Sequence, residues 1–236
     1  MLESLRNKRI LIVVAHPDDE LLGLGASMHR LINDYNVKTR VVILGEGLTS
    51  RSLTRNSKEW TKHLLEHKEN IRSAQNEIGY HTINTFDFPD NRFDSVDLLD
   101  IIKVVENEKE NFRPDVILTH HGGDLNIDHQ KTFEAVFTAC RPMENENVKA
   151  IITFETPSGT EWRSNADPHH FLPNLFIKIS SENLEAKIRG MQSYKFESRS
   201  FPHPRSPEAL RIQAQRWGIV VGIKFAEAFN IIRLVN

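Results

Sequence analysis

Six residues, Ala15 to Glu20 (AHPDDE), place one imidazole and three carboxylates in one short stretch. Packing carboxylates this closely in a desolvated place is costly unless a cation or a proton compensates their charge. His16 and Asp19 are three residues apart, so both side chains can reach one point, and the pair suits zinc, iron or manganese. Asp18, between them, could instead address a water on such a metal. The structural alternative is helix capping, because acidic residues favour the first turn of a helix.

A second cluster, His120 to Gln130 (HHGGDLNIDHQ), holds three histidines and two aspartates. His129 together with His16 and Asp19 would form a set of two histidines and one carboxylate. Such a set leaves coordination positions open, which is typical of a catalytic metal rather than of a closed structural one. The alternative makes Asp128 a helix cap and His129 a surface residue, with the other histidines bonded to loop carbonyls.

Strand-like and helix-like segments alternate along the chain that must position these residues. The predicted strands cover 9–15, 39–44, 81–88, 115–119, 150–155 and 174–179, and the predicted helices cover 20–35, 58–78, 96–112, 129–139, 181–194 and 207–229. This alternation indicates βαβ units and a mainly parallel sheet flanked by helices, so we expect an α/β fold. Because we find no repeat and no linker, we expect residues 1–236 to form one domain.

Both clusters directly follow predicted strands. Polar turns also follow three other strands, at 45–47 (GEG), 89–91 (PDN) and 155–159 (ETPSG). Ligands of parallel sheets bind outside the carboxyl ends of the strands. The sequence therefore places the candidate site at the carboxyl edge of the sheet.

Composition excludes several classes of protein. The chain has 30 Lys and Arg against 32 Asp and Glu, so its net charge of −2 gives no footprint for nucleic acid or an anionic membrane. The single cysteine, Cys140, rules out an internal disulfide and a Cys-rich zinc module. The longest apolar run, 10–15, is too short to span a bilayer. Since the first residues contain no apolar stretch of a secretory signal, we expect a cytoplasmic protein.

Two familiar enzyme motifs are missing from the sequence. Gly23 and Gly25 lie inside a helical pattern and not in the turn after the first strand, so we expect no dinucleotide binding. No Gly-x-Ser-x-Gly sequence occurs, so we do not expect a serine hydrolase.

AHPDDE after the first strand and Asp128-His129 after the fourth resemble the LmbE/PIG-L family of metal-dependent N-deacetylases. The segments 45–47 (GEG), 88–91 (FPDN), 155–162 (ETPSGTEW) and 201–209 (FPHPRSPEA) also look familial, so the resemblance covers most of the chain. It implies a Rossmann-like α/β fold. It further implies a zinc cofactor, although the ligand types also accept ferrous iron. N-acetylated amino sugars or their conjugates are the implied substrates.

The resemblance also implies roles for single residues. It makes His16, Asp19 and His129 the metal ligands and Asp18 the general base. Many members carry a histidine three residues before the last ligand, where this chain has Asn126. An amide can donate a hydrogen bond to an oxyanion, but it cannot carry a proton at neutral pH. We therefore expect Asn126 to stabilise the oxyanion.

With asparagine at that position, a histidine acid must lie elsewhere or be absent. The candidates in the sequence are His121, His120 and His203, and His203 is also a candidate substrate contact. Arg51 follows the GEG turn, where an arginine resembles a family substrate contact, since guanidinium suits a phosphate or a pair of sugar hydroxyls. Glu46 of the same turn is a further candidate for a sugar hydroxyl.

Each candidate substrate contact has a structural alternative. Arg51 and His203 could be ordinary loop residues. Asp90 is a further candidate for a sugar hydroxyl, but its role could instead be to form the turn. Trp162 is a candidate for stacking on a sugar, but it could instead be a packing residue. We expect a zinc-dependent N-deacetylase of an N-acetyl sugar or glycoconjugate. The alternatives are an amidase or another metal hydrolase at the same site, such as a phosphoesterase, and a non-catalytic carbohydrate-binding relative. The sequence leaves the oligomeric state open and is compatible with a homo-oligomer.

Overall fold

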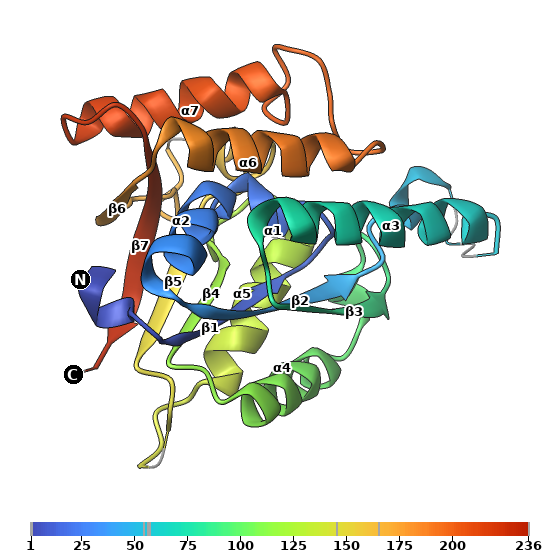
Figure 1. Ribbon diagram of the computed structural model, residues 1–236. Coiled ribbons are helices and arrows are strands. Elements are labelled where there is room, and N and C mark those ends of the chain that lie inside the picture. The colour runs from blue at the N-terminus through green and yellow to red at the C-terminus, as the bar shows by residue number, and fades with distance from the viewer. Residues whose placement is uncertain (1, 54, 56–57, 145, 165, 236) are drawn as a thin grey trace.

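A seven-stranded sheet runs through the molecule, with helices on both of its faces (Figure 1). The computed structural model describes residues 2–53, 55, 58–144, 146–164 and 166–235. The strands are β1 (Arg9–Val14), β2 (Lys38–Gly45), β3 (Thr82–Phe88), β4 (Val116–His120), β5 (Ala150–Phe154), β6 (Leu175–Lys178) and β7 (Ala226–Leu234). The helices are α1 (Asp19–Leu22), α2 (Gly25–Tyr35), α3 (Thr61–Ile78), α4 (Leu98–Phe112), α5 (Ile127–Ala139), α6 (Ser181–Ser193) and α7 (Pro207–Val220).

The strands lie in the order β3-β2-β1-β4-β5-β7-β6. The first five of these strands are parallel to one another, and β7 is antiparallel to both β5 and β6. The expected α/β fold with a mainly parallel sheet is confirmed. Parallel pairing puts the carboxyl ends of β1 and β4 next to each other, and this places the two polar clusters side by side.

The sheet separates two apolar clusters. Helices α4 and α5 cover one face, and α2, α3, α6 and α7 contribute to the cluster on the other. β1, β4 and β5 are almost entirely buried because helices lie over both of their faces. Burying each large aliphatic side chain contributes about 1.5–3 kcal/mol relative to its exposure, so this core holds the strand ends in place.

The helix predicted at 20–35 is interrupted. The structure has the short α1, then Gly23 and the non-helical Leu24, then α2. A Cβ atom on Gly23 would lie 2.0 Å from the backbone oxygen of Glu155, so no larger residue fits there. This close approach fixes the turn that carries the acidic residues against the end of β5.

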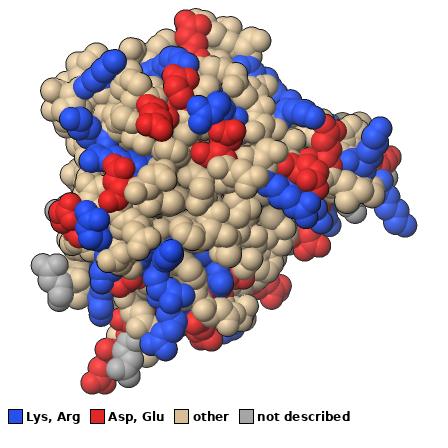
Figure 2. All heavy atoms as spheres, in the orientation of Figure 1, with Lys and Arg blue, Asp and Glu red and all other residues tan. Residues whose placement is uncertain are grey.

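The helix predicted at 207–229 was wrong in its second half. Helix α7 ends at Val220, and the chain reverses through Gly222, whose φ of +72° favours glycine. The following residues form β7, an inserted strand between β5 and β6 that the sequence analysis missed. No helix among the described residues is long and apolar enough to span a membrane. On the face shown in Figure 2, basic and acidic side chains are interspersed.

Candidate metal centre

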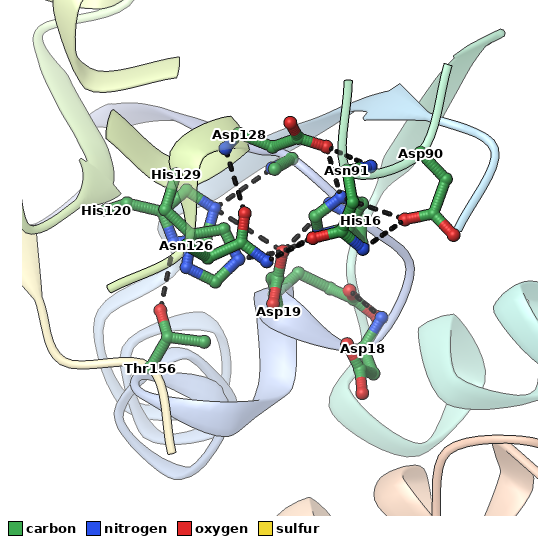
Figure 3. A network of polar contacts seen from close by, with 12 residues as sticks. His16, Asp18, Asp19, Asp90, Asn91, His120, Asn126, Asp128, His129 and Thr156 are labelled. Carbon is green, nitrogen blue, oxygen red and sulfur yellow. Dashed lines mark hydrogen bonds and ion pairs between the residues drawn. The ribbon is translucent and has the colours of Figure 1, made fainter. Parts of the chain in front are cut away.

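Two histidines and one aspartate converge at the carboxyl ends of β1 and β4 (Figure 3). The Oδ2 atom of Asp19 lies 3.4 Å from Nδ1 of His16 and 3.4 Å from Nε2 of His129. All three residues are buried, with 8% of His16, 0% of Asp19 and 3% of His129 exposed. The structure therefore brings together the three residues that the sequence analysis proposed as metal ligands.

Buried atoms without hydrogen-bond partners make these three residues suitable ligands for a divalent metal. Among the described residues, the buried Oδ1 of Asp19 and the buried Nε2 of His129 have no hydrogen-bond partner. Buried polar atoms are normally paired, so such atoms on two adjacent side chains indicate a site for an external partner. Two imidazoles with one carboxylate suit zinc or ferrous iron.

Each candidate histidine ligand has its own carboxylate behind it. His16 Nε2 lies 2.8 Å from Asp128 Oδ2, and His129 Nδ1 lies 3.1 Å from Asp124 Oδ1. These acids engage the ring nitrogens that face away from Asp19, so the other nitrogens are left for a ligand. This arrangement orients metal-binding histidines and raises their basicity in many proteins. Burial opposes the charged imidazolium, but Asp19 and Asp124 outweigh it and raise the pKa of His129 to about 9.

Asp128 and Asp90 both approach the same nitrogen of His16. Asp128 also accepts the backbone N–H groups of Asn91, at 2.6 Å, and Phe93, at 2.9 Å. Asp90 Oδ1 lies 3.4 Å from His16 Nε2, while its other oxygen accepts the N–H and hydroxyl of Ser50. Since these acids are already satisfied by donors, we interpret them as orienting His16.

His120 supports the centre without offering it a free nitrogen. Its Nε2 accepts the backbone N–H of Ala15 at 2.9 Å, and its Nδ1 lies 2.9 Å from the hydroxyl of Thr156. These partners specify a neutral ring with its proton on Nδ1. Burial, with the neighbouring His129, lowers the pKa of His120 to about 4. The ring stacks on His129 with 3.9 Å between centroids.

Asp18 lies beside the cluster in an unusual backbone conformation. Its φ is +106°, a value rare for residues other than glycine, and its side chain is only 1% exposed. Its N–H donates to Glu20 Oε2 at 2.9 Å, and its Oδ2 lies 2.8 Å from Nη1 of Arg205. Burial raises the pKa of Asp18 well above its usual range, and Arg205 opposes that shift. Arg205 lies in the segment 201–209, and no local sequence pattern marked this arginine as a site residue.

Asn126 is the N-cap of α5. Its Oδ1 accepts the N–H of Asp128 at 2.8 Å, and its Nδ2 donates to Oδ1 of Asn91 at 3.0 Å. The structural alternative that made Asp128 the cap is therefore wrong, because Asn126 takes that place and Asp128 faces His16. One hydrogen of the Asn126 amide is committed to Asn91, and the other can serve a ligand.

The remaining sequence candidates are engaged with other residues. Arg51 donates to the carbonyl of Phe196 at 3.0 Å and forms an ion pair with Glu197. Glu46 accepts from the hydroxyl of Thr49 at 2.5 Å and from Arg55 Nε at 2.8 Å.

The two loop histidines are likewise paired. His121 Nε2 lies 2.6 Å from the carbonyl of His169. His203 Nδ1 accepts the N–H of Arg205 at 3.1 Å, and its ring meets that of Trp162 edge-on with centroids 5.9 Å apart. The structure thus gathers His16, Asp18, Asp19, Asn126 and His129, whereas Glu46, Arg51, His121 and His203 contact neighbouring loops.

Comparisons with known sequences give two matches. The sequence profile of the family described as PIG-L: GlcNAc-PI de-N-acetylase matches residues 11–140. The chain is also 30% identical over 199 residues to the uncharacterized deacetylase YaiS of Escherichia coli (strain K12), covering 81% of this chain and 94% of YaiS. All five gathered residues lie within the range that the profile matches.

Solved structures of other proteins share the fold. N,N'-diacetylchitobiose deacetylase from Pyrococcus horikoshii, complexed with its inhibitor MPG, has a TM-score of 0.70 at 16% identity, covering 96% of this chain and 84% of that chain. GalB, the 4-carboxy-2-hydroxymuconate hydratase from Pseudomonas putida KT2440, has a TM-score of 0.73 at 19% identity, covering 97% and 98%. At these identities the likeness shows the fold alone, and one fold hosts both reactions.

Proposed function

The chain belongs to the PIG-L/LmbE family of deacetylases, and from that premise we propose that it is a metal-dependent hydrolase of N-acetylated amino sugars or their conjugates. The products would be acetate and a free amine. One observation carries the proposal: within the matched range, a buried cluster of two histidines and one carboxylate leaves Asp19 Oδ1 and His129 Nε2 without a hydrogen-bond partner among the described residues. A binding protein without catalysis would have no need for the additional carboxylate of Asp18 beside this cluster.

We assign the metal to His16, Asp19 and His129, with zinc or ferrous iron as the ion. A bound ion of this kind activates water and polarises a carbonyl. Asp124 and Asp128 orient the two imidazoles through their far nitrogens, so that the near nitrogens converge on Asp19.

Asp18 is the proposed general base. Its carboxylate takes a proton from the attacking water as the water oxygen bonds to the acetamide carbon. The free N–H of Asn126 donates to the carbonyl oxygen as negative charge develops there. The C–N bond then breaks, and the proton held by Asp18 passes to the departing nitrogen. This route needs no histidine at the position of Asn126.

The substrate class is the finer part of the proposal. N-acetyl amino sugars are favoured because the matched profile and the Pyrococcus horikoshii enzyme both carry sugar deacetylase descriptions. The hydratase that shares the fold supplies a rival, in which the same site adds water to a carbon–carbon double bond. Release of acetate and amine separates hydrolysis from hydration.

The test uses protein purified without chelator and its Asp18→Asn variant. Metal content is measured by elemental analysis, and acetate and amine release are followed with N-acetylglucosamine, N,N'-diacetylchitobiose and an aryl phosphate. Acetate and amine released in equal amounts by the wild type alone would support the proposal. Phosphate release without acetate would point to a phosphoesterase, and a wild type that binds no metal even after reconstitution would overturn the assignment.

A further inference from the structure

Arg205 joins the proposed base to two other segments at the carboxyl edge. Its Nη1 lies 2.8 Å from Asp18 Oδ2 and 2.6 Å from Glu197 Oε2, and its Nε donates to Ser158 Oγ at 2.7 Å. The Arg205 side chain is 22% exposed and that of Asp18 is 1% exposed. The guanidinium therefore compensates a carboxylate that has almost no access to water, and removing it would leave an unpaired buried charge.

The backbone of Asp18 is held by a separate chain of contacts, which runs through Glu20 to Tyr194, a residue close to Arg205 in the sequence. The Asp18 N–H donates to Glu20 Oε2 at 2.9 Å, and the other Glu20 oxygen accepts the hydroxyl of Tyr194 at 2.5 Å. Tyr194 is the C-cap of α6, and Arg205 directly precedes Ser206, the N-cap of α7. The connection between these helices, 194–206, thus holds both the backbone and the carboxylate of Asp18.

We propose that Arg205 is a positioning residue for the hydrolysis: it holds one oxygen of Asp18 so that the other meets the attacking water. The inference rests on the proposed function, since it concerns the base of that reaction. Arg205 lies outside residues 11–140, so this device belongs to the part of the chain beyond the matched family profile. A planar guanidinium, anchored on Ser158 and Glu197, fixes a carboxylate more firmly than a flexible ammonium does.

The first arm of the test separates orientation from binding. In Arg205→Met we expect kcat to fall about 10²-fold, as a misplaced catalytic group commonly causes, with KM and metal content nearly unchanged. Arg205→Lys should give an intermediate kcat. Guanidinium chloride added at non-denaturing concentration should restore part of the kcat of Arg205→Ala, which a merely structural role would not produce.

Arg40 offers a matched control. Its side chain is 21% exposed and pairs with the buried Glu108 at 3.2 Å, near the amino end of β2 and away from Asp18. Arg40→Met should lower Tm comparably and leave kcat unchanged. An equal loss of kcat in both methionine variants, or a loss confined to KM in Arg205→Met, would overturn the positioning role.

A second arm does not depend on activity. Thermal unfolding is compared for wild type, Asp18→Asn, Arg205→Met and the double variant. Arg205→Met should lower Tm on the order of 10 °C, and adding Asp18→Asn should recover most of that loss because the buried charge is then gone. Additive shifts would overturn the positioning proposal whatever the activity. If the Tm shifts of the two variants are coupled but the wild type releases acetate from none of the substrates tested, the proposed function is overturned instead.

Discussion

The molecule contains two buried groups of charged side chains that differ in how they are satisfied. In the candidate metal centre, Asp19 Oδ1 and His129 Nε2 are buried without a hydrogen-bond partner among the described residues. In the second group, Lys187 and Glu227 pair at 2.8 Å, and each side chain is 4% exposed. Glu227 also accepts two backbone N–H groups at the start of α2, from Ala26 at 3.3 Å and Ser27 at 2.6 Å.

This difference distinguishes a candidate ligand site from a structural ion pair. The Lys187–Glu227 pair fulfils its own hydrogen bonds and ties α6 and β7 to the positive end of the α2 dipole, so its charges serve the fold. The candidate metal centre is equally buried, yet Asp19 Oδ1 and His129 Nε2 have no hydrogen-bond partner among the described residues, so these atoms are available to an external ligand. Both groups are buried and charged, and they differ in whether each buried polar atom has a hydrogen-bond partner.

Among the variants that test this contrast, we expect His129→Ala to have the largest effect. Metal content should fall from about one ion per chain to almost none after dialysis, and activity should vanish, because one of three ligands is gone. Elemental analysis against His63→Ala, an exposed histidine of α3, checks the result. Full metal content in His129→Ala would remove this residue from the site.

Asp18→Asn should separate chemistry from metal binding. We expect kcat to fall about 10²–10⁴-fold, the usual contribution of a general base, with metal content retained. Steady-state kinetics on any substrate found by acetate release, together with elemental analysis, measure both. Near-normal kcat would refute the base assignment.

Lys187→Met should show the opposite pattern. Removing the ammonium leaves Glu227 buried without its cation, which we expect to cost about 3–5 kcal/mol of unfolding free energy. Metal content should stay unchanged, since the pair does not belong to the metal centre. Denaturant unfolding measures the loss, and Lys187→Met/Glu227→Gln should recover much of it. A loss of metal in the single variant would show that the two groups are coupled.

Glu155 gives a pH test near the Lys187–Glu227 pair. Burial raises the pKa of Glu155 to about 7, against the N–H of Trp217 and the charge of Lys187. Because the unfolded carboxyl ionises at lower pH, this group reduces stability as pH rises from about 4.5 to about 7, by up to about 3 kcal/mol. The Tm of Glu155→Gln relative to that of the wild type should therefore increase between about pH 5 and about pH 8. A constant difference would contradict the shifted pKa.

Asn126→Ala should have the smallest effect. The helix α5 loses its cap, at a cost of about 1 kcal/mol, and turnover should fall modestly through the lost oxyanion donor. Asn126→Asp keeps the helix cap but has no amide donor. Comparing the kcat of Asn126→Ala with that of Asn126→Asp therefore separates the role in capping from the role as oxyanion donor. Unchanged kcat in both variants would mean that Asn126 only starts the helix.

Much of the centre followed from the sequence because its chemistry is local. His16 and Asp19 share one turn, and parallel β1 and β4 are neighbours, so strand order alone brings His129 to them. Arg205 was missed because its contact with Asp18 depends on how the connection between α6 and α7 folds back, which no local pattern encodes. β7 was missed because its apolar residues continue a helix-like pattern, and the reversal depends on the backbone of Gly222.

The place of β7 also sets an order of events during synthesis. β6 pairs with β7, which leaves the ribosome some fifty residues later, so at roughly 5–20 residues per second β6 waits several seconds for that partner. Glu227, which caps α2, arrives about two hundred residues after the helix that it stabilises. Until β7 is made, the edge of β5 therefore has no strand partner and the start of α2 lacks its carboxylate, so the nascent chain carries an unpaired sheet edge that could aggregate.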